Sequence, residues 1–107
     1  MTYVINTRRL PEPAMTIGIE PQGELRSEKA ARLLLDRFVM VLAATRPERI
    51  VVDLSAVPSI SEDGVEALRS GCDKAAVTEA RVAVVHSAPE VRDQLHRHGL
   101  ENLIARS

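Results

Sequence analysis

The sequence predicts an α/β domain in which a mixed β-sheet is covered by about three to four helices. Its 107 residues suffice for one hydrophobic core, so we expect a single domain over residues 1–107. Hydrophobic residues make up 45% and charged residues 27% of the chain, which is ordinary for a soluble globular protein. After a first hairpin, short β-branched runs alternate with helical stretches, a pattern typical of parallel strands joined by right-handed crossovers.

Two strands open the chain. Residues 3–9 form the first expected strand, which ends at Pro11 and Pro13 because proline lacks a backbone donor. Apolar side chains then alternate with smaller ones at Met15, Ile17 and Ile19. This period of two predicts a second strand with one apolar face, closed by residues 21–23.

A helix follows from Ser27, which we expect to be its N-cap. Its apolar stripe has helical spacing and consists of Ala30, Leu34, Phe38, Val41 and Leu42. The helix should end between Thr45 and Pro47. The β-branched run at residues 50–54 is then typical of a central strand covered on both faces.

The last third of the chain predicts a helix, a strand and a helix. The second helix should begin near Gly64, and residues 81–86 form a second central strand. Ser87 and Glu90 have the spacing of a capping box for the third helix. Gly99 suits the left-handed position that ends a helix.

The loop after the first central strand carries the strongest motif. It reads DLSAVPSISEDGV over residues 53–65. This resembles the signature of STAS domains, the family of bacterial anti-sigma factor antagonists, roughly Asp-Leu-Ser-x-Val-x-Phe-x-Asp-Ser-Ser-Gly-Leu. The matching residues are Asp53, Leu54, Ser55, Val57 and Gly64, with Val65 a close replacement. The similarity extends over residues 15–103 and includes Gly23-Glu24-Leu25 upstream and Gly99-Leu100 downstream.

The resemblance implies a protein-binding regulator. In this family the second Ser of the loop, directly before Gly, is phosphorylated by a partner kinase that is also the anti-sigma factor. The unphosphorylated domain binds that kinase, and phosphorylation ends the binding. The acceptor lies at a helix N-terminus, where phosphate adds roughly −1.5 to −2 charge at the contact.

This chain departs from the family at the contact itself. Asp63 stands at the acceptor position, and Glu62 replaces the Ser before it. Ser61 replaces the Asp of the pattern and Ser59 its Phe. Upstream, Arg26 reverses the charge of the Asp in the family's Gly-Glu-Leu-Asp. The resemblance therefore makes Arg26 and residues 59–64 the expected partner-binding surface.

Three interpretations of Asp63 stay open. It could be the N-cap of the second helix, with Glu66 completing a box-like arrangement. It could be a fixed, partial mimic of the phosphorylated state, or a direct contact for a partner, together with Glu62. Ser61, and less directly Ser59, offers a displaced hydroxyl as an alternative phosphosite, although loop serines commonly form turns.

Composition argues against several other function classes. Fourteen basic and fifteen acidic residues give a net charge of −1, unlike a nucleic-acid or anionic-membrane protein. No apolar run suffices for membrane insertion, and the lone Cys72 fits a cytoplasmic location. His96 and His98 are two apart on a helix and do not share a face, so no metal site is expected. No cofactor motif is present.

We therefore expect a non-catalytic, cytoplasmic STAS-like domain that binds a serine kinase-like anti-sigma factor, with a homodimer as a further option. The alternative is an accessory subunit of a transporter ATPase or of a stressosome-like assembly. An enzyme would instead need a deep polar cleft at the strand ends. The aromatic content of 2% leaves an aliphatic core, with Ser59 where the family often has Phe.

Overall fold

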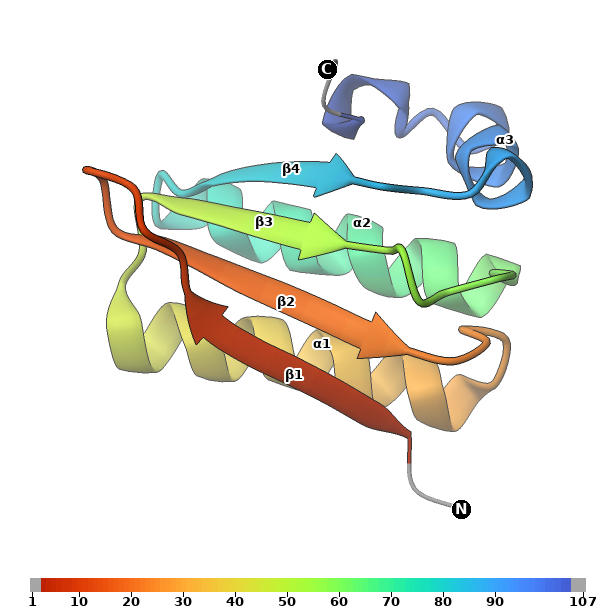
Figure 1. The fold of residues 1–107 in the computed structure, drawn as a ribbon, viewed down its shortest axis with the longest axis horizontal. Coiled ribbons are helices and arrows are strands. Elements are labelled where there is room, and N and C mark those ends of the chain that lie inside the picture. The colour runs from red at the N-terminus through yellow and green to blue at the C-terminus, as the bar shows by residue number, and fades with distance from the viewer. Residues whose placement is uncertain (1–2, 105–107) are drawn as a thin grey trace.

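The computed structural model describes residues 3–104, which form a four-stranded sheet with helices packed against it (Figure 1). The strands are β1 (Val4–Arg9), β2 (Thr16–Gln22), β3 (Arg49–Asp53) and β4 (Arg81–Val85), in that order across the sheet. β1 pairs antiparallel with β2, whereas β2 with β3 and β3 with β4 are parallel. The predicted mixed sheet is confirmed. The predicted domain limits at residues 1 and 107 lie outside the described residues.

Three α-helices and one short 3₁₀ helix connect and flank the strands. They are α1 (Glu28–Thr45), α2 (Glu62–Val77), α3 (Pro89–Arg97) and η1 (Glu101–Leu103). α1 and α2 lie side by side behind the sheet, whereas α3 and η1 lie beside β4 (Figure 1). Because α1 follows β2 and α2 follows β3, both helices begin at the edge where the parallel strands end. None of the helices within residues 3–104 combines the length and apolar character needed to cross a membrane.

The core lies between the sheet and the pair α1 and α2. Ile19, Val52 and Val84 stand in register across three strands, and all are fully buried. Phe38 of α1 is also fully buried, and it packs against Gly71 of α2. A Cβ atom on Gly71 would lie 2.6 Å from two carbons of the Phe38 ring. The two helices therefore approach closely because a glycine faces the only phenylalanine of the chain.

The predicted limits of α1 and of α3 at its C-terminus are confirmed. The Ser27 hydroxyl accepts a hydrogen bond from the Ala30 N–H at 3.0 Å, which makes Ser27 the N-cap of α1. Gly99 follows α3 with a φ of +76°, and the Leu100 N–H donates to the Leu95 carbonyl at 2.8 Å. This left-handed glycine closes the helix as expected.

One expectation about helix starts is confirmed and one is wrong. α2 begins at Glu62, so Gly64 lies in its first turn, near the predicted start. The capping box of Ser87 and Glu90 does not form, because Ala88 is the N-cap of α3 and no side chain caps it. Pro89 instead begins the helix, where its missing N–H costs no hydrogen bond.

The strands also differ from their predicted surroundings. β2 buries four successive residues rather than one face, and Leu10 covers one of them, Gly18. β4 is not a central strand but the last in the sheet order. Ile104 forms a parallel bridge with Val84 and so pairs with part of this edge.

Candidate functional site

Two loops at the carboxyl edge of the sheet are joined through backbone hydrogen bonds. The Leu25 N–H donates to the Ser59 carbonyl at 2.9 Å, and the Ser61 N–H donates to the Leu25 carbonyl at 3.0 Å. Leu25 and Ile60 thus form a parallel bridge, and both side chains are buried. The segment before α1 and the segment before α2 consequently form one surface, which contains Arg26 and residues 59–64 and which we call the loop surface.

Gly64 is the close-contact point of the loop surface. It is buried in the first turn of α2 and faces the other loop. A Cβ atom there would lie 2.6 Å from the Leu25 carbonyl oxygen and 2.7 Å from Cγ1 of Ile60. Only glycine fits this spacing without a shift of the backbone, which gives a physical reason for the Gly in the motif.

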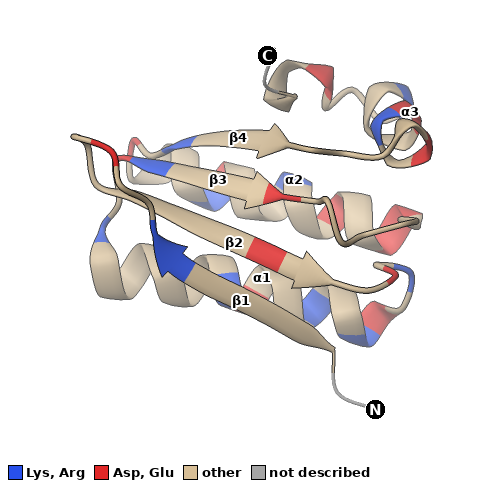
Figure 2. Cartoon of the chain, viewed as in Figure 1, with Lys and Arg blue, Asp and Glu red and all other residues tan. Residues whose placement is uncertain are grey.

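The start of α2 carries an exposed acidic pair. Glu62 and Asp63 are the first two residues of the helix, and both are exposed. Their charge is favourable there because the helix dipole places partial positive charge at an N-terminus. Figure 2 shows acidic residues at this end of α2 and charges of both signs in the adjacent loop between β2 and α1.

The interpretation of Asp63 as an N-cap is wrong. Ser61 is the N-cap of α2, so Asp63 lies within the helix and Glu66 completes no box with it. The Ser61 side chain does not cap the helix either, because its hydroxyl donates to the Leu25 carbonyl at 3.5 Å. The sequence signal that could have placed the cap correctly is a serine directly before two acidic residues, because Ser is a preferred N-cap and acidic residues favour the first turn.

The remaining predicted residues flank this acidic pair. Ser61 and Ser59 are half-buried, and the Ser59 hydroxyl oxygen is buried without a hydrogen-bond partner among residues 3–104. Arg26 is exposed and forms no ion pair with any described side chain. All six predicted residues are thus brought to one end of the α1 and α2 pair.

Asp53 and His86 form a second polar group at the same edge of the sheet, which the motif comparison did not pair. One Asp53 oxygen accepts from the Ser55 N–H at 2.9 Å, and the other lies 3.3 Å from His86 Nδ1. Burial raises the pKa of Asp53, but the Ser55 hydrogen bonds and His86 outweigh it and hold the pKa below its ordinary value. Asp53 therefore accepts a backbone hydrogen bond from the loop that follows its own strand.

The other titratable residues singled out in the sequence do not build a reactive site. Cys72 is half-buried, and its pKa is raised to about 11 by burial and by the charge of Asp73. Residues 3–104 contain no cluster of three His, Cys, Asp or Glu side chains that could hold a metal ion.

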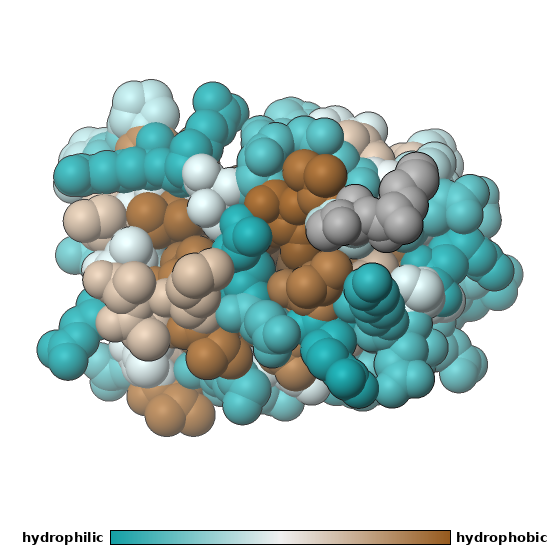
Figure 3. Space-filling view, turned by 90° about the horizontal axis from the view of Figure 1, so that it is seen from below, coloured by the Kyte–Doolittle hydropathy of each residue, from teal (hydrophilic) through white to brown (hydrophobic). Residues whose placement is uncertain are grey.

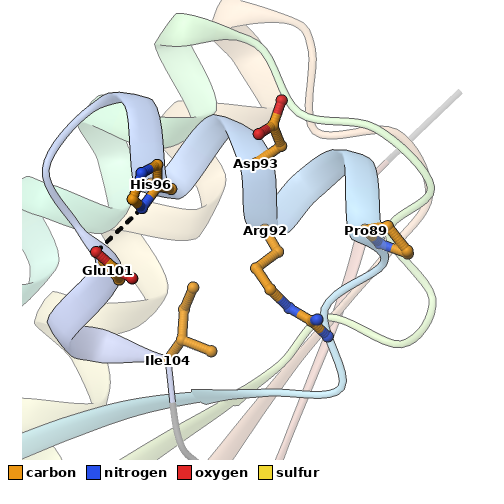
Figure 4. Close-up of a pocket in the computed structure, with 6 residues that line it drawn as sticks. All are labelled: Pro89, Arg92, Asp93, His96, Glu101 and Ile104. Atoms are coloured by element: carbon orange, nitrogen blue, oxygen red, sulfur yellow. Dashed lines mark ion pairs between the residues drawn. The ribbon is translucent and has the colours of Figure 1, made fainter.

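A small pocket lies between α3 and η1 and shares no lining residue with the loop surface. Its volume is about 350 Å³, and Arg92, His96 and Glu101 project around it (Figure 4). His96 Nδ1 lies 3.0 Å from Glu101, and Arg97 pairs with Asp93 at 3.2 Å. Two basic side chains of this helix, His96 and Arg97, are therefore paired with acidic neighbours.

Comparison with known proteins decides the family. The family model described as STAS domain matches residues 9–106. The chain belongs to the STAS domain family. No curated protein matches the chain.

Solved structures share the fold of this STAS domain. The anti-sigma factor antagonist SpoIIAA in its unphosphorylated form is 14% identical, with a TM-score of 0.79 over 99% of this chain and 88% of its own. An anti-sigma factor antagonist from Mycobacterium paratuberculosis is 25% identical, with a TM-score of 0.74 over 94% of this chain and 83% of its own. A sulfate transporter family protein from Wolinella succinogenes is 17% identical, with a TM-score of 0.68 over 84% and 71%. The solved structures with this fold thus include anti-sigma factor antagonists and a transporter-family protein.

Proposed function

We propose that this STAS domain is a non-catalytic, cytoplasmic regulator that binds a serine kinase-like anti-sigma factor through the loop surface. In this proposal Asp63 occupies the phospho-acceptor position, so the partner does not control this chain by phosphorylation. The domain uses neither a cofactor nor a metal ion. Its direct partner is a protein, not a nucleic acid or a membrane.

The bridge between Leu25 and Ile60 is the observation that carries the proposal. It joins the loop before α1 to the loop before α2, so that exposed Arg26 and the acidic pair Glu62 and Asp63 belong to one continuous surface. Buried Gly64 fixes the spacing of that surface. A preorganised surface with exposed charges suits recognition of a protein, because charges at an interface select the partner and speed association.

Chemistry supports the loss of phosphorylation. A carboxylate cannot accept a phosphoryl group as a stable ester, and it carries less charge than a phosphate. The two nearby hydroxyls are poorly placed as substitutes. The Ser59 oxygen is buried, and Ser61 is half-buried with its hydroxyl turned toward the Leu25 carbonyl.

A kinase assay tests the loss of phosphorylation. The wild-type chain, Asp63→Ser and Glu66→Ser are each incubated with ATP and an anti-sigma kinase from the same organism, and phosphate is located by mass spectrometry. We expect phosphate only on Asp63→Ser, at residue 63. Glu66→Ser is the matched control, because Glu66 is an exposed acidic residue one turn further along α2. Phosphate on Ser61 or Ser59 of the wild-type chain would refute the proposal.

A binding assay with the same kinase tests the surface. Isothermal titration calorimetry should give a complex with the wild-type chain that Arg26→Glu weakens by about tenfold, since a reversed charge at an interface introduces repulsion. Lys29→Glu changes the charge by the same amount just outside the loop surface and should leave the affinity within about twofold. Equal loss in both variants would assign the effect to net charge rather than to the loop surface.

A second candidate is an accessory subunit of a transporter ATPase or of a stressosome-like assembly. The likeness in fold to the sulfate transporter family protein favours it. Affinity purification from the native host separates the candidates, because recovery of a transporter ATPase in place of an anti-sigma kinase would support the second. Analytical ultracentrifugation of the purified chain tests whether it forms a homodimer.

A further inference from the structure

A groove lies between the last turns of α1 and α2, at the end of these helices opposite the loop surface. Its volume is about 820 Å³, within the range of sites that bind compact ligands or side-chain clusters. Its lining includes Val39 and Leu42 from the last turns of α1, Pro47 from the loop after it, and Val77 from the end of α2. In Figure 1 both helices end at the left, whereas the loop surface lies at the right.

The groove exposes more apolar surface than isolated surface residues do. Val39 is 45% exposed and Val77 is 84% exposed, and Met40, which follows Val39 in α1 but does not line the groove, is 53% exposed. These are three of the four large hydrophobic residues that are exposed within residues 3–104. In the view from below, hydrophobic side chains reach the surface in the left half of the molecule, which is the half where α1 and α2 end (Figure 3). Clustered exposed apolar side chains mark interaction surfaces, whereas single ones do not.

Two positively charged side chains also line the groove. Arg46 and Lys74 line it, and neither forms an ion pair with an acidic side chain among the described residues. Neither side chain donates a hydrogen bond to another residue within residues 3–104. The two cationic groups are therefore available to an external anion.

We propose that this groove docks an amphipathic α-helix of a second partner protein. The apolar side of that helix contacts Val39, Leu42 and Val77, while its acidic residues pair with Arg46 and Lys74. A helix is favoured over an extended peptide because both walls of the groove are helices, which offer no free strand edge for backbone pairing. Acidic residues are favoured because the two cations that line the groove pair with no acidic side chain of residues 3–104, and no lining residue is acidic.

The docked helix does not compete with the partner of the loop surface. α1 has 18 residues and α2 has 16, so at a rise of about 1.5 Å per residue the two ends are roughly 24–27 Å apart. This inference does not depend on the identity of the loop-surface partner. The domain would connect two proteins, one at each end of the α1 and α2 pair.

A designed peptide tests the groove. The probe is a fluorescein-labelled amphipathic helix of about 18 residues, with Leu at helical spacing on one face and Glu beside it. Fluorescence anisotropy should detect binding to the wild-type chain, and amide chemical shifts should move at residues 39–47 and 74–78. A peptide of the same composition in scrambled order is the control for nonspecific binding and should not bind.

Variants make the test specific. Val77→Ser and Lys74→Glu should each weaken binding by about fivefold or more, and a peptide with Lys in place of Glu should regain affinity for Lys74→Glu. Lys29→Glu, at the other end of α1, should change nothing, and thermal unfolding checks that each variant folds. Equal binding of the scrambled peptide, or shifts confined to other residues, would overturn the proposal. Binding only to phosphatidylglycerol vesicles would assign the groove to a lipid surface. A wild-type dimer that Val77→Ser abolishes would assign the groove to a second copy of the chain. Either result would also overturn the proposal.

Discussion

Gly64 is the residue at which the two loops of the candidate site touch. Because a Cβ atom there would lie 2.6 Å from the Leu25 carbonyl oxygen, we predict that Gly64→Ala lowers the free energy of unfolding by about 1–3 kcal/mol. Urea denaturation measures the change. Glu66→Ala, on the exposed side of the same helix, is the control and should change stability by less than about 0.5 kcal/mol. A Gly64→Ala variant as stable as the wild-type chain would show that the loops can separate at little cost.

Asp53 gives the stability of the domain a dependence on pH. Its folded pKa lies below its unfolded value, so its carboxylate stabilises the fold above the unfolded pKa of about 4. That contribution is lost as the pH falls through the folded pKa. We predict that Asp53→Ala costs about 1–2 kcal/mol at pH 7 and less at pH 3, as measured by urea denaturation at both values. Asp36→Ala removes an exposed carboxylate and is the control. Its cost in unfolding free energy should be the same at pH 7 and at pH 3.

Cys72 should be an unreactive thiol. Burial raises its pKa to about 11 from an ordinary 9.0, so the thiolate fraction at pH 8 falls by about 100-fold. We predict that iodoacetamide alkylates the folded chain far more slowly than the urea-unfolded chain, with mass spectrometry as the measurement. Equal rates would mean that the thiol reaches solvent in the native state.

At the scale of the helices, two N-cap serines differ in their role. Ser27 caps α1 with its hydroxyl, whereas Ser61 caps α2 without a side-chain hydrogen bond to the helix. Ser27→Ala should therefore cost about 1 kcal/mol of unfolding free energy, and Ser61→Ala clearly less. Thermal and urea unfolding of both variants give the comparison. The reverse ranking would mean that the weak contact of Ser61 with the Leu25 carbonyl matters more than helix capping.

The contact of α1 with α2 depends on one large and one absent side chain. Phe38 fills the space that a side chain at position 71 would need. We predict that Gly71→Ala costs about 1–3 kcal/mol in the wild-type chain and less in a Phe38→Leu background, because the smaller residue relieves the clash. Urea denaturation of the four chains completes the double-mutant cycle. Additive costs would contradict a direct clash.

At the scale of the molecule, α1 and α2 separate two surfaces of different character. One end has exposed charges on closely joined loops, and the other has exposed apolar side chains with two cations. The shared helices are rigid elements of the core, since both contribute fully buried residues. A protein built this way suits the role of an adaptor, with affinity at each end set by separate residues.

The sequence by itself determined the α/β class, the element order and the family motif, because hydrophobic periodicity and local turn chemistry are written in neighbouring residues. It predicted the Ser27 cap and the Gly99 helix end for the same reason. The tertiary structure decided the contacts between residues distant in the chain. Gly64 against Leu25, Gly71 against Phe38 and Asp53 beside His86 each join separate segments. The groove at the far helix ends also followed only from folding, because burial and exposure depend on which segments pack together.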